Sequence, residues 1–200
     1  MKSFQLSLVA ATLLLATASC NSSTDSVKEA QKVNEAKADS TVQPTGQGAA
    51  VKDDKKDDSE FMTKAASGGL LEVQMGTEVA KRARTPGARQ AAEQMVKDHT
   101  KGNAELKALA AKKNITLPTV LGDEQQKVYN DVLANKDVSL DKEYVKQMVK
   151  DHKDDIKEFT DGSTKAGDPE VRAYAAKNIP MLQMHLAMFE KLQAEMDAKK

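Results

Sequence analysis

The hexapeptide QMVKDH occupies residues 94–99, and the same six residues return at 147–152. Each copy ends in a histidine, His99 and His152, and the whole chain contains only three histidines. Within each copy the Met and the His are four residues apart, a spacing that puts both side chains on one face of a helix. The repeat therefore predicts two helices that contribute equivalent side chains to a shared core.

Composition favours a single helical domain. The 200 residues are enough for one domain with a hydrophobic core. Thirty Lys and Arg residues balance thirty Asp and Glu residues, so net charge favours neither nucleic acid nor an anionic membrane surface as a partner. Trp is absent, aromatic residues make up 4% of the chain, and Ala, Lys, Glu, Asp, Leu and Met dominate. We therefore expect an all-α protein that does not bind nucleic acid.

The first 19 residues resemble a bacterial lipoprotein signal peptide. An apolar stretch, too short for a membrane span, follows Lys2 and ends in small residues just before Cys20, the only cysteine. The resemblance implies cleavage before Cys20, lipid on that residue and attachment to a membrane. Because Asn21 follows in place of an inner-membrane retention Asp, we expect the cell envelope, facing the periplasm at the outer membrane. The alternative is an ordinary signal peptide.

The polar segment that follows predicts a tether. Residues 21–58 are rich in Ser, Thr, Gln, Lys and Asp, and contain almost nothing large to bury. Such a composition is typical of disordered chain. We therefore expect a signal peptide at 1–19, a lipidated Cys20 with a disordered tether over 20–58, and a folded domain over 59–200.

Helical periodicity begins near Ser59. Apolar and small residues recur at steps of three and four, and predict long helices over 59–84, 86–113, 139–167 and 169–196, with a short extra helix over 123–134. Thr85-Pro86 and Asp168-Pro169 are typical of helix starts, because the first residue caps the helix and Pro tolerates its first turn. Four long helices with one apolar face each predict a four-helix bundle.

A polar layer is expected inside this bundle. Glu72, His99, His152 and His185 lie on the inner stripes, each near the middle of its predicted helix, so all four should lie at one height. Three imidazoles and one carboxylate suit one zinc, copper or iron ion. The alternative is a metal-free hydrogen-bonded network, with Asn103 or Asn178 among its partners.

Neighbouring residues extend this candidate site. Asp98 and Asp151 lie one position off the inner stripe, and Tyr144 lies on it, so they are candidates to orient the ligands; the alternative for the two aspartates is solvated surface charge. Met precedes each His by four residues, at Met95, Met148 and Met181. Because the last helix runs opposite to its neighbour, one ion could not use all three Met residues. We expect them to fill the core.

Four runs of sequence resemble a known family: GGLLEVQMGTEVAKRA (68–83), MVKDHTKGNAELKALAAKKNITLP (95–118), LDKEYVKQMVKDH (140–152) and IPMLQMHLAMFEKL (179–192). They are similar to the bacterial domain-of-unknown-function family 4142. The resemblance implies an exported, ferritin-like four-helix bundle. The family's recurring positions correspond to Glu72, Asp98-His99, His152, and Pro180 with His185, whereas Leu140-Asp141 replaces its usual Phe-Asp.

These observations support three hypotheses about the function of the protein. The first is an envelope lipoprotein that binds one transition metal in metal or stress handling. The second is a non-enzymatic structural or interaction module with a metal-free core layer, whose protein partner the sequence does not identify. The third is a di-iron redox enzyme, which the absence of any Glu-x-x-His motif disfavours. We expect a protein that is not an enzyme.

Overall fold

The computed structural model describes residues 25–41 and 48–198, and every regular element within those ranges is a helix. The six helices are α1 (Ser26–Thr41), α2 (Gly48–Arg82), α3 (Pro86–Lys113), α4 (Asp123–Leu133), α5 (Asp137–Lys165) and α6 (Pro169–Asp197). The predicted all-α class is confirmed, as are the four long helices and the short extra one between the second and the third.

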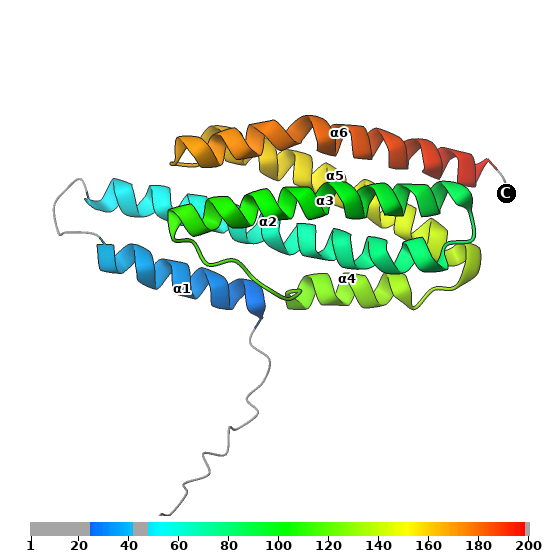
Figure 1. The fold of residues 1–200 in the computed structure, drawn as a ribbon, viewed down its shortest axis with the longest axis horizontal. Coiled ribbons are helices and arrows are strands. Elements are labelled where there is room, and N and C mark those ends of the chain that lie inside the picture. The colour runs from blue at the N-terminus through cyan, green and yellow to red at the C-terminus, as the bar shows by residue number, and fades with distance from the viewer. Residues whose placement is uncertain (1–24, 42–47, 199–200) are drawn as a thin grey trace, which may run out of the picture.

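The bundle consists of two antiparallel hairpins, α2–α3 and α5–α6 (Figure 1). Helices α3 and α5 run in the same direction, so the chain between them must return along the length of the bundle. The segment 114–122 and helix α4 make that return on the outer side of α2 (Figure 1). A single crossover connection of this kind is the ferritin-like arrangement of four helices.

Both predicted capped starts occur. Thr85 has extended backbone angles, and its side-chain oxygen accepts a hydrogen bond from the N–H of Ala88. Asp168 likewise accepts from the N–H groups of Glu170 and Val171 at the start of α6. These side chains satisfy N–H groups that have no partner within their own helix, and so they define where α3 and α6 begin.

A buried carboxylate connects the α2–α3 turn to α5. Asp141, fully buried near the start of α5, accepts hydrogen bonds from the backbone N–H groups of Arg84 (3.2 Å) and Thr85 (2.7 Å) and from the Thr85 hydroxyl (2.7 Å). Hydrogen bonds to a charged acceptor are among the stronger ones in proteins. Asp141 therefore holds the two hairpins in register at this end of the bundle.

The apolar core is divided into two clusters. One contains Met75, Val79, Met95, Met148 and Phe189 among its members, and the other contains Phe61, Met62, Leu106, Phe159 and Leu182. On α3, α5 and α6, the residue predicted for the polar layer lies between the two clusters in sequence, and on α2 Glu72 follows Leu71, the residue at which one cluster begins. The polar layer therefore separates one half of the core from the other.

Small residues let α2 and α3 approach closely. A Cβ added at Gly69 would lie 2.0 Å from Oδ1 of Asn103, and one at Gly76 would lie 3.2 Å from the backbone oxygen of Ala92. A side chain at Gly69 would displace the Asn103 amide, and one at Gly76 would press on Ala92 and Val96 of α3. Glycine at these positions therefore fits the close approach of the two helices.

The expectation of a disordered tether over 20–58 is wrong for the part the structure describes. Residues 26–41 form α1, and α2 begins at Gly48, so the predicted domain start at Ser59 is wrong as well. Helix α1 packs along α2 through a narrow stripe, Ala30, Asn34 and Ala38, in which only small or polar side chains are buried. A search for large apolar residues could not detect such a stripe.

Helix α1 is held by hydrogen bonds to a distant loop. The Asn34 amide donates to the backbone oxygen of Thr116 (2.9 Å) and accepts from its N–H (2.7 Å). Lys37 Nζ donates to the backbone oxygen of Asn114 and the hydroxyl of Thr116. The loop partners lie about 80 residues further along the chain.

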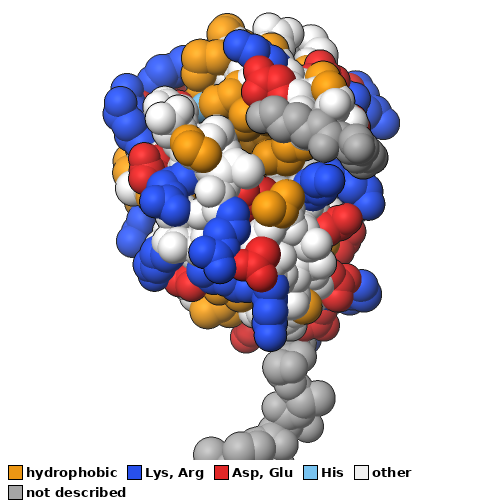
Figure 2. Space-filling model, turned by 90° about the vertical axis from the view of Figure 1, so that its right-hand side faces the viewer, with side chains coloured by type: hydrophobic (Ala, Val, Ile, Leu, Met, Phe, Trp, Pro, Cys, Tyr) orange, Lys and Arg blue, Asp and Glu red, His pale blue; other side chains and the backbone are white. Residues whose placement is uncertain are grey.

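The predicted signal peptide and Cys20 lie outside the described residues. Within 25–41 and 48–198, none of the helices combines the length and the apolar character that crossing a membrane would require. Figure 2 shows one end of the molecule, where basic and acidic side chains both occur across the surface, as the balanced composition predicts.

Candidate metal centre

The polar layer draws one residue from each long helix. Glu72 (α2), His99 (α3), His152 (α5) and His185 (α6) are 3%, 6%, 0% and 0% exposed. Their contacts are short: Nδ1 of His99 lies 2.7 Å from a Glu72 oxygen, and Nε2 of His152 lies 3.6 Å from the other. The structure thus brings together the four residues that helix spacing predicted.

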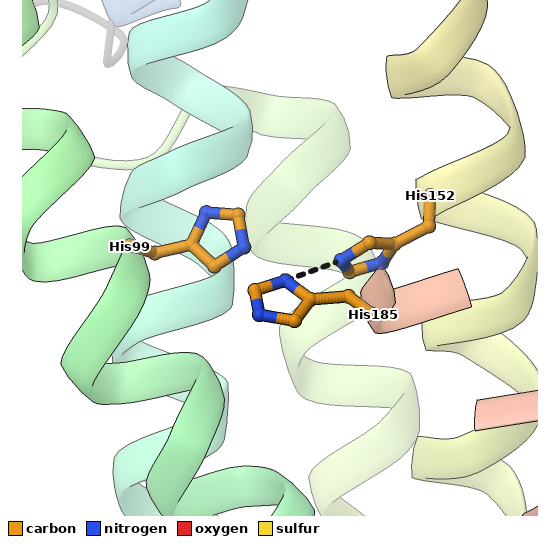
Figure 3. A group of neighbouring side chains, drawn as sticks. All are labelled: His99, His152 and His185. Atoms are coloured by element: carbon orange, nitrogen blue, oxygen red, sulfur yellow. Dashed lines mark hydrogen bonds between the residues drawn. The ribbon is translucent and has the colours of Figure 1, made fainter. Parts of the chain in front are cut away.

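His152 and His185 face each other, and in each ring the hydrogen is on the nitrogen that points away from the other ring. Nδ1 of His152 lies 2.9 Å from the backbone oxygen of Met148, so it must carry the proton. Nε2 of His185 lies 2.9 Å from Oδ2 of Asp98 and must likewise donate. When both rings are neutral and keep these bonds, Nε2 of His152 and Nδ1 of His185 each carry a lone pair. The 3.3 Å contact between them, drawn as a dashed line in Figure 3, is a hydrogen bond only if one of the two rings takes up a further proton.

The third histidine is hydrogen-bonded to Glu72. When Glu72 is a carboxylate, Nδ1 of neutral His99 donates to it and Nε2 carries a lone pair. When Glu72 takes up a proton, it donates to Nδ1, and the ring hydrogen of His99 is on Nε2. Among the described residues, Nε2 of His99 has no hydrogen-bond partner in either state. Figure 3 shows one ring nitrogen of His99 facing the other two rings. The free oxygen of Glu72 also lacks a hydrogen-bond partner in this part of the chain.

Burial keeps the layer uncharged when no cation is bound. Burial lowers the pKa of His99 to about 4 and that of His152 to about 3, and it also lowers the pKa of His185. It raises the pKa of Glu72 well above its usual range, and the nearby Asp151 raises it further. Neutral imidazoles are the form that binds metal ions.

The distances within the layer suit one tetrahedral ion. With metal–nitrogen distances of about 2.0–2.1 Å, the ligand atoms of a tetrahedral site lie about 3.3–3.4 Å apart. The His152–His185 nitrogen distance is 3.3 Å, and the nearest Glu72 oxygen is 3.6 Å from His152. One ligand atom from each of the three histidines lies within 4.8 Å of the others. A small movement of His99 would complete the set.

A further carboxylate, which the sequence reasoning missed, joins this region. Asp155 forms a second group with Glu72 and His152, whose potential ligand atoms all lie within 4.8 Å of one another. It follows His152 by three residues on α5, a spacing that places both on one face of the helix. This three-residue spacing is the feature of the sequence that could have predicted Asp155 beside His152. Burial raises the pKa of Asp155 well above its usual range, and the charge of Glu72 raises it further.

The residues expected to orient the ligands behave differently from one another. Asp98 hydrogen-bonds His185, as described above, whereas Asp151 is bonded by Gln147 on its own helix. Tyr144 is fully buried against Phe189, and its hydroxyl has no hydrogen-bond partner within the described ranges. Only Asp98 therefore contacts a histidine of the layer.

The three methionines fill the core, as the helix directions predict. Met95 and Met148 are fully buried in one apolar cluster, whereas Met181 packs against the other cluster, on the opposite side of the layer. The three sulfurs therefore cannot contact one ion.

Fold and site together define a ferritin-like helical bundle with a histidine-rich polar layer in its core. The chain belongs to the family described as domain of unknown function DUF4142, whose model matches residues 41–192. Its fold is also similar to a crystal structure of a DUF305 fragment from Deinococcus radiodurans, with a TM-score of 0.61 and 9% sequence identity. That match covers 70% of this chain and 96% of the fragment, and at this identity it shows the fold alone. No curated protein matches the sequence.

Proposed function

We propose that this protein binds one transition-metal ion, zinc, copper or iron, through Glu72, His99, His152 and His185. The observation that carries the proposal is the pair of lone pairs on His152 and His185, 3.3 Å apart in the core. Two acceptors at that distance repel each other unless a cation lies between them. Each ring is turned to this position by a hydrogen bond at its other nitrogen, an arrangement typical of metal-binding histidines.

The alternative is a structural module whose layer is held by hydrogen bonds alone. It has support in the short His99–Glu72 contact. However, a free Glu72 oxygen and Nε2 of His99 remain buried without hydrogen-bond partners among the described residues, and unsatisfied groups of this kind destabilise a fold. A ligand that contacts both atoms would remove this loss of stability, which favours the hypothesis of a metal site.

A di-iron oxidase is less well supported. Sites of that kind use four carboxylates and two histidines. Among the described residues, the groups that could hold a metal ion at this layer include only two carboxylates, Glu72 and Asp155, and both groups depend on His152. One ring nitrogen of His152 is already bonded to Met148, so this residue has a single nitrogen left for one ion.

We further propose that lipid on Cys20 attaches the domain to the cell envelope, facing the periplasm at the outer membrane, where it takes part in metal or stress handling. This placement is supported by the lipoprotein-like residues before Cys20. Mass analysis of the mature N-terminus tests it. Acylated Cys20 is the expected result, and a free Cys20 or cleavage at another residue would contradict it.

Metal content beside thermal melting tests the proposed site. Protein purified without chelator should carry about one ion per chain, and adding zinc to chelator-treated protein should raise its melting temperature. The His99→Ala, His152→Ala and His185→Ala variants should each weaken zinc binding at least 100-fold. As a control, Asp131→Asn removes an exposed carboxylate of α4, paired with Lys127, and should bind zinc as the unchanged protein does.

The opposite outcome would support the structural module. In that case metal content stays near zero, and zinc, copper and iron leave the melting temperature unchanged. The histidine variants would then lose only stability, by about 1–3 kcal/mol each, because their buried partners lose a hydrogen bond.

A further inference from the structure

An acidic cavity opens beside the polar layer, where α1 and α4 meet end to end along α2. Its volume is about 450 Å³, and its walls come from the first residues of α1 and α4 together with α2 and α5. Seven carboxylates and three lysines line it. It reaches the surface, because Glu124, Lys150 and Asp154 on its wall are exposed.

The carboxylates become more buried along this cavity. Glu124 and Asp154 are exposed, Asp151, Asp155 and Glu158 are partly buried, and Glu72 at the inner end is 3% exposed. One oxygen each of Glu72, Asp151 and Glu158 is buried without a hydrogen-bond partner in the part of the chain that the structure describes. Buried acceptors of negative charge without donors suit a cation.

Two of the three lysines on the wall are already paired, and the third, Lys28, is exposed at the surface. Lys64 Nζ lies 2.9 Å from a Glu60 oxygen, and Lys150 Nζ lies 3.1 Å from an Asp154 oxygen. Both ammonium groups are thus paired with carboxylates near the surface. The unpaired inner oxygens of Glu72 and Glu158 remain open to a mobile ion.

Glu72 and Asp155 connect this cavity to the histidines. Both line the acidic cavity, and both also line a second, small cavity of about 20 Å³ that includes His99. Together with His152 they form the group whose potential ligand atoms lie within 4.8 Å of one another. The two carboxylates therefore stand between the outer acidic cavity and the histidine layer.

We propose that the acidic cavity admits a divalent cation to the layer, with Glu72 and Asp155 as the inner position where it binds first. The proposal rests on the proposed function and adds the path that the ion takes. His152 has one free ring nitrogen. That nitrogen belongs both to the group with His99 and His185 and to the group with Glu72 and Asp155, so an ion in one group excludes an ion in the other. The cation therefore leaves Asp155, keeps Glu72 and gains the three histidines, and the two positions do not fill at the same time.

The rate of loading tests this route. Cobalt(II), a spectroscopic substitute for zinc, is mixed with chelator-treated mature protein in a stopped-flow instrument. Negative charge lining a cleft raises the association rate of a cation by about 10- to 1,000-fold. At pH 8, where Glu158 is ionised, Glu158→Gln should lower the association rate about tenfold by removing charge, and Asp155→Asn should do so by removing a carboxylate that binds the entering ion. The exposed control Asp131→Asn should keep the rate of the unchanged protein. Salt should slow the unchanged protein more than the two cavity variants.

Each outcome decides a separate point. Slow loading of both cavity variants, with native circular dichroism, supports the route, and loading of both at the normal rate overturns it. A folded Asp155→Asn protein that binds no cobalt at saturation also overturns it, because Asp155 would then be a permanent ligand. If the unchanged protein itself binds no cobalt, the proposed function fails, and the route fails with it.

Discussion

Asp98 on α3 accepts a hydrogen bond from Nε2 of His185 on α6, with 2.9 Å between the two atoms. Burial alone would raise the pKa of Asp98. Hydrogen bonds from Gln94 and His185 nevertheless hold this pKa below its usual value, so Asp98 accepts as a carboxylate. The equivalent aspartate of the second hexapeptide, Asp151, has no such partner and lines the acidic cavity instead. The two copies thus set Met and His alike and use Asp differently.

The Asp98–His185 bond predicts the effect of Asp98→Asn on metal affinity. An amide at this position is a weaker acceptor, so His185 is less firmly oriented and its inner nitrogen is less basic. The Kd for zinc, measured by competition with a chelator, should rise about 10- to 100-fold. Glu93→Gln, an exposed change on the same helix, should leave the Kd unchanged. An unchanged Kd in Asp98→Asn would show that the bond does not support metal binding.

Glu158 predicts a pH dependence of stability. Burial raises the pKa of Glu158 from 4.5 to about 7. The folded protein therefore keeps this proton up to about pH 7, whereas the unfolded chain loses it near 4.5, and the free energy of unfolding falls as pH rises between these values. With metal removed, Glu158→Gln should be about 1–3 kcal/mol more stable than the unchanged protein at pH 8. At pH 4 the two should be equally stable.

Urea unfolding at both pH values checks this prediction. Asp154→Asn, which removes an exposed carboxylate of the same helix, should show no comparable gain at pH 8. A Glu158→Gln protein whose advantage is the same at pH 4 and pH 8 would contradict the titration of Glu158 as the cause.

Asp141 predicts a large loss of stability. Asp141→Ala removes a buried acceptor of three hydrogen bonds and takes this partner from the partly buried N–H groups of Arg84 and Thr85. The free energy of unfolding should fall by about 3 kcal/mol. Asp154→Ala, which breaks an exposed ion pair, should cost less than about 1 kcal/mol. A small effect at Asp141 would mean that the turn does not depend on this carboxylate.

Asn34 predicts local release of α1. Asn34→Ala removes both hydrogen bonds that this buried side chain of α1 makes to the backbone of Thr116. What remains includes a narrow stripe of small side chains and the hydrogen bonds of Lys37 and Ser26 to the 114–120 segment. Limited proteolysis should cut α1 at least several-fold faster, while α2–α6 stay resistant. Glu35→Ala, at an exposed neighbouring position, should be cut at the normal rate. Equal cutting of all three proteins would show that α1 is held by other contacts.

Local pattern was sufficient for much of the bundle. Thr85-Pro86 and Asp168-Pro169 predicted two helix starts correctly, because capping depends on residues adjacent in sequence. The inner stripes predicted that Glu72 and the histidines would share a layer, because the helical period alone decides which side chains face inward. Asp155 was not predicted although its spacing from His152 was visible, because that spacing alone does not distinguish a buried carboxylate from a solvated one.

Helix α1 shows where local pattern was not sufficient. Its buried residues are Ala30, Asn34 and Ala38, and their partners include Thr116, 82 residues beyond Asn34. A weakly apolar segment becomes a helix here because a distant loop satisfies its polar groups, and no local pattern carries that information.

The sequence by itself determined the class of fold, the positions of three of the four long helices and the four residues of the layer, since each follows from periodicity and capping within one helix. Only the tertiary structure decided which ring nitrogens of His152 and His185 are free. It also decided that Asp98 orients a histidine while Asp151, in an identical hexapeptide, lines an acidic cavity. The reason is that a hydrogen bond depends on which atom of a neighbouring helix lies within about 3 Å, and helix packing sets that distance.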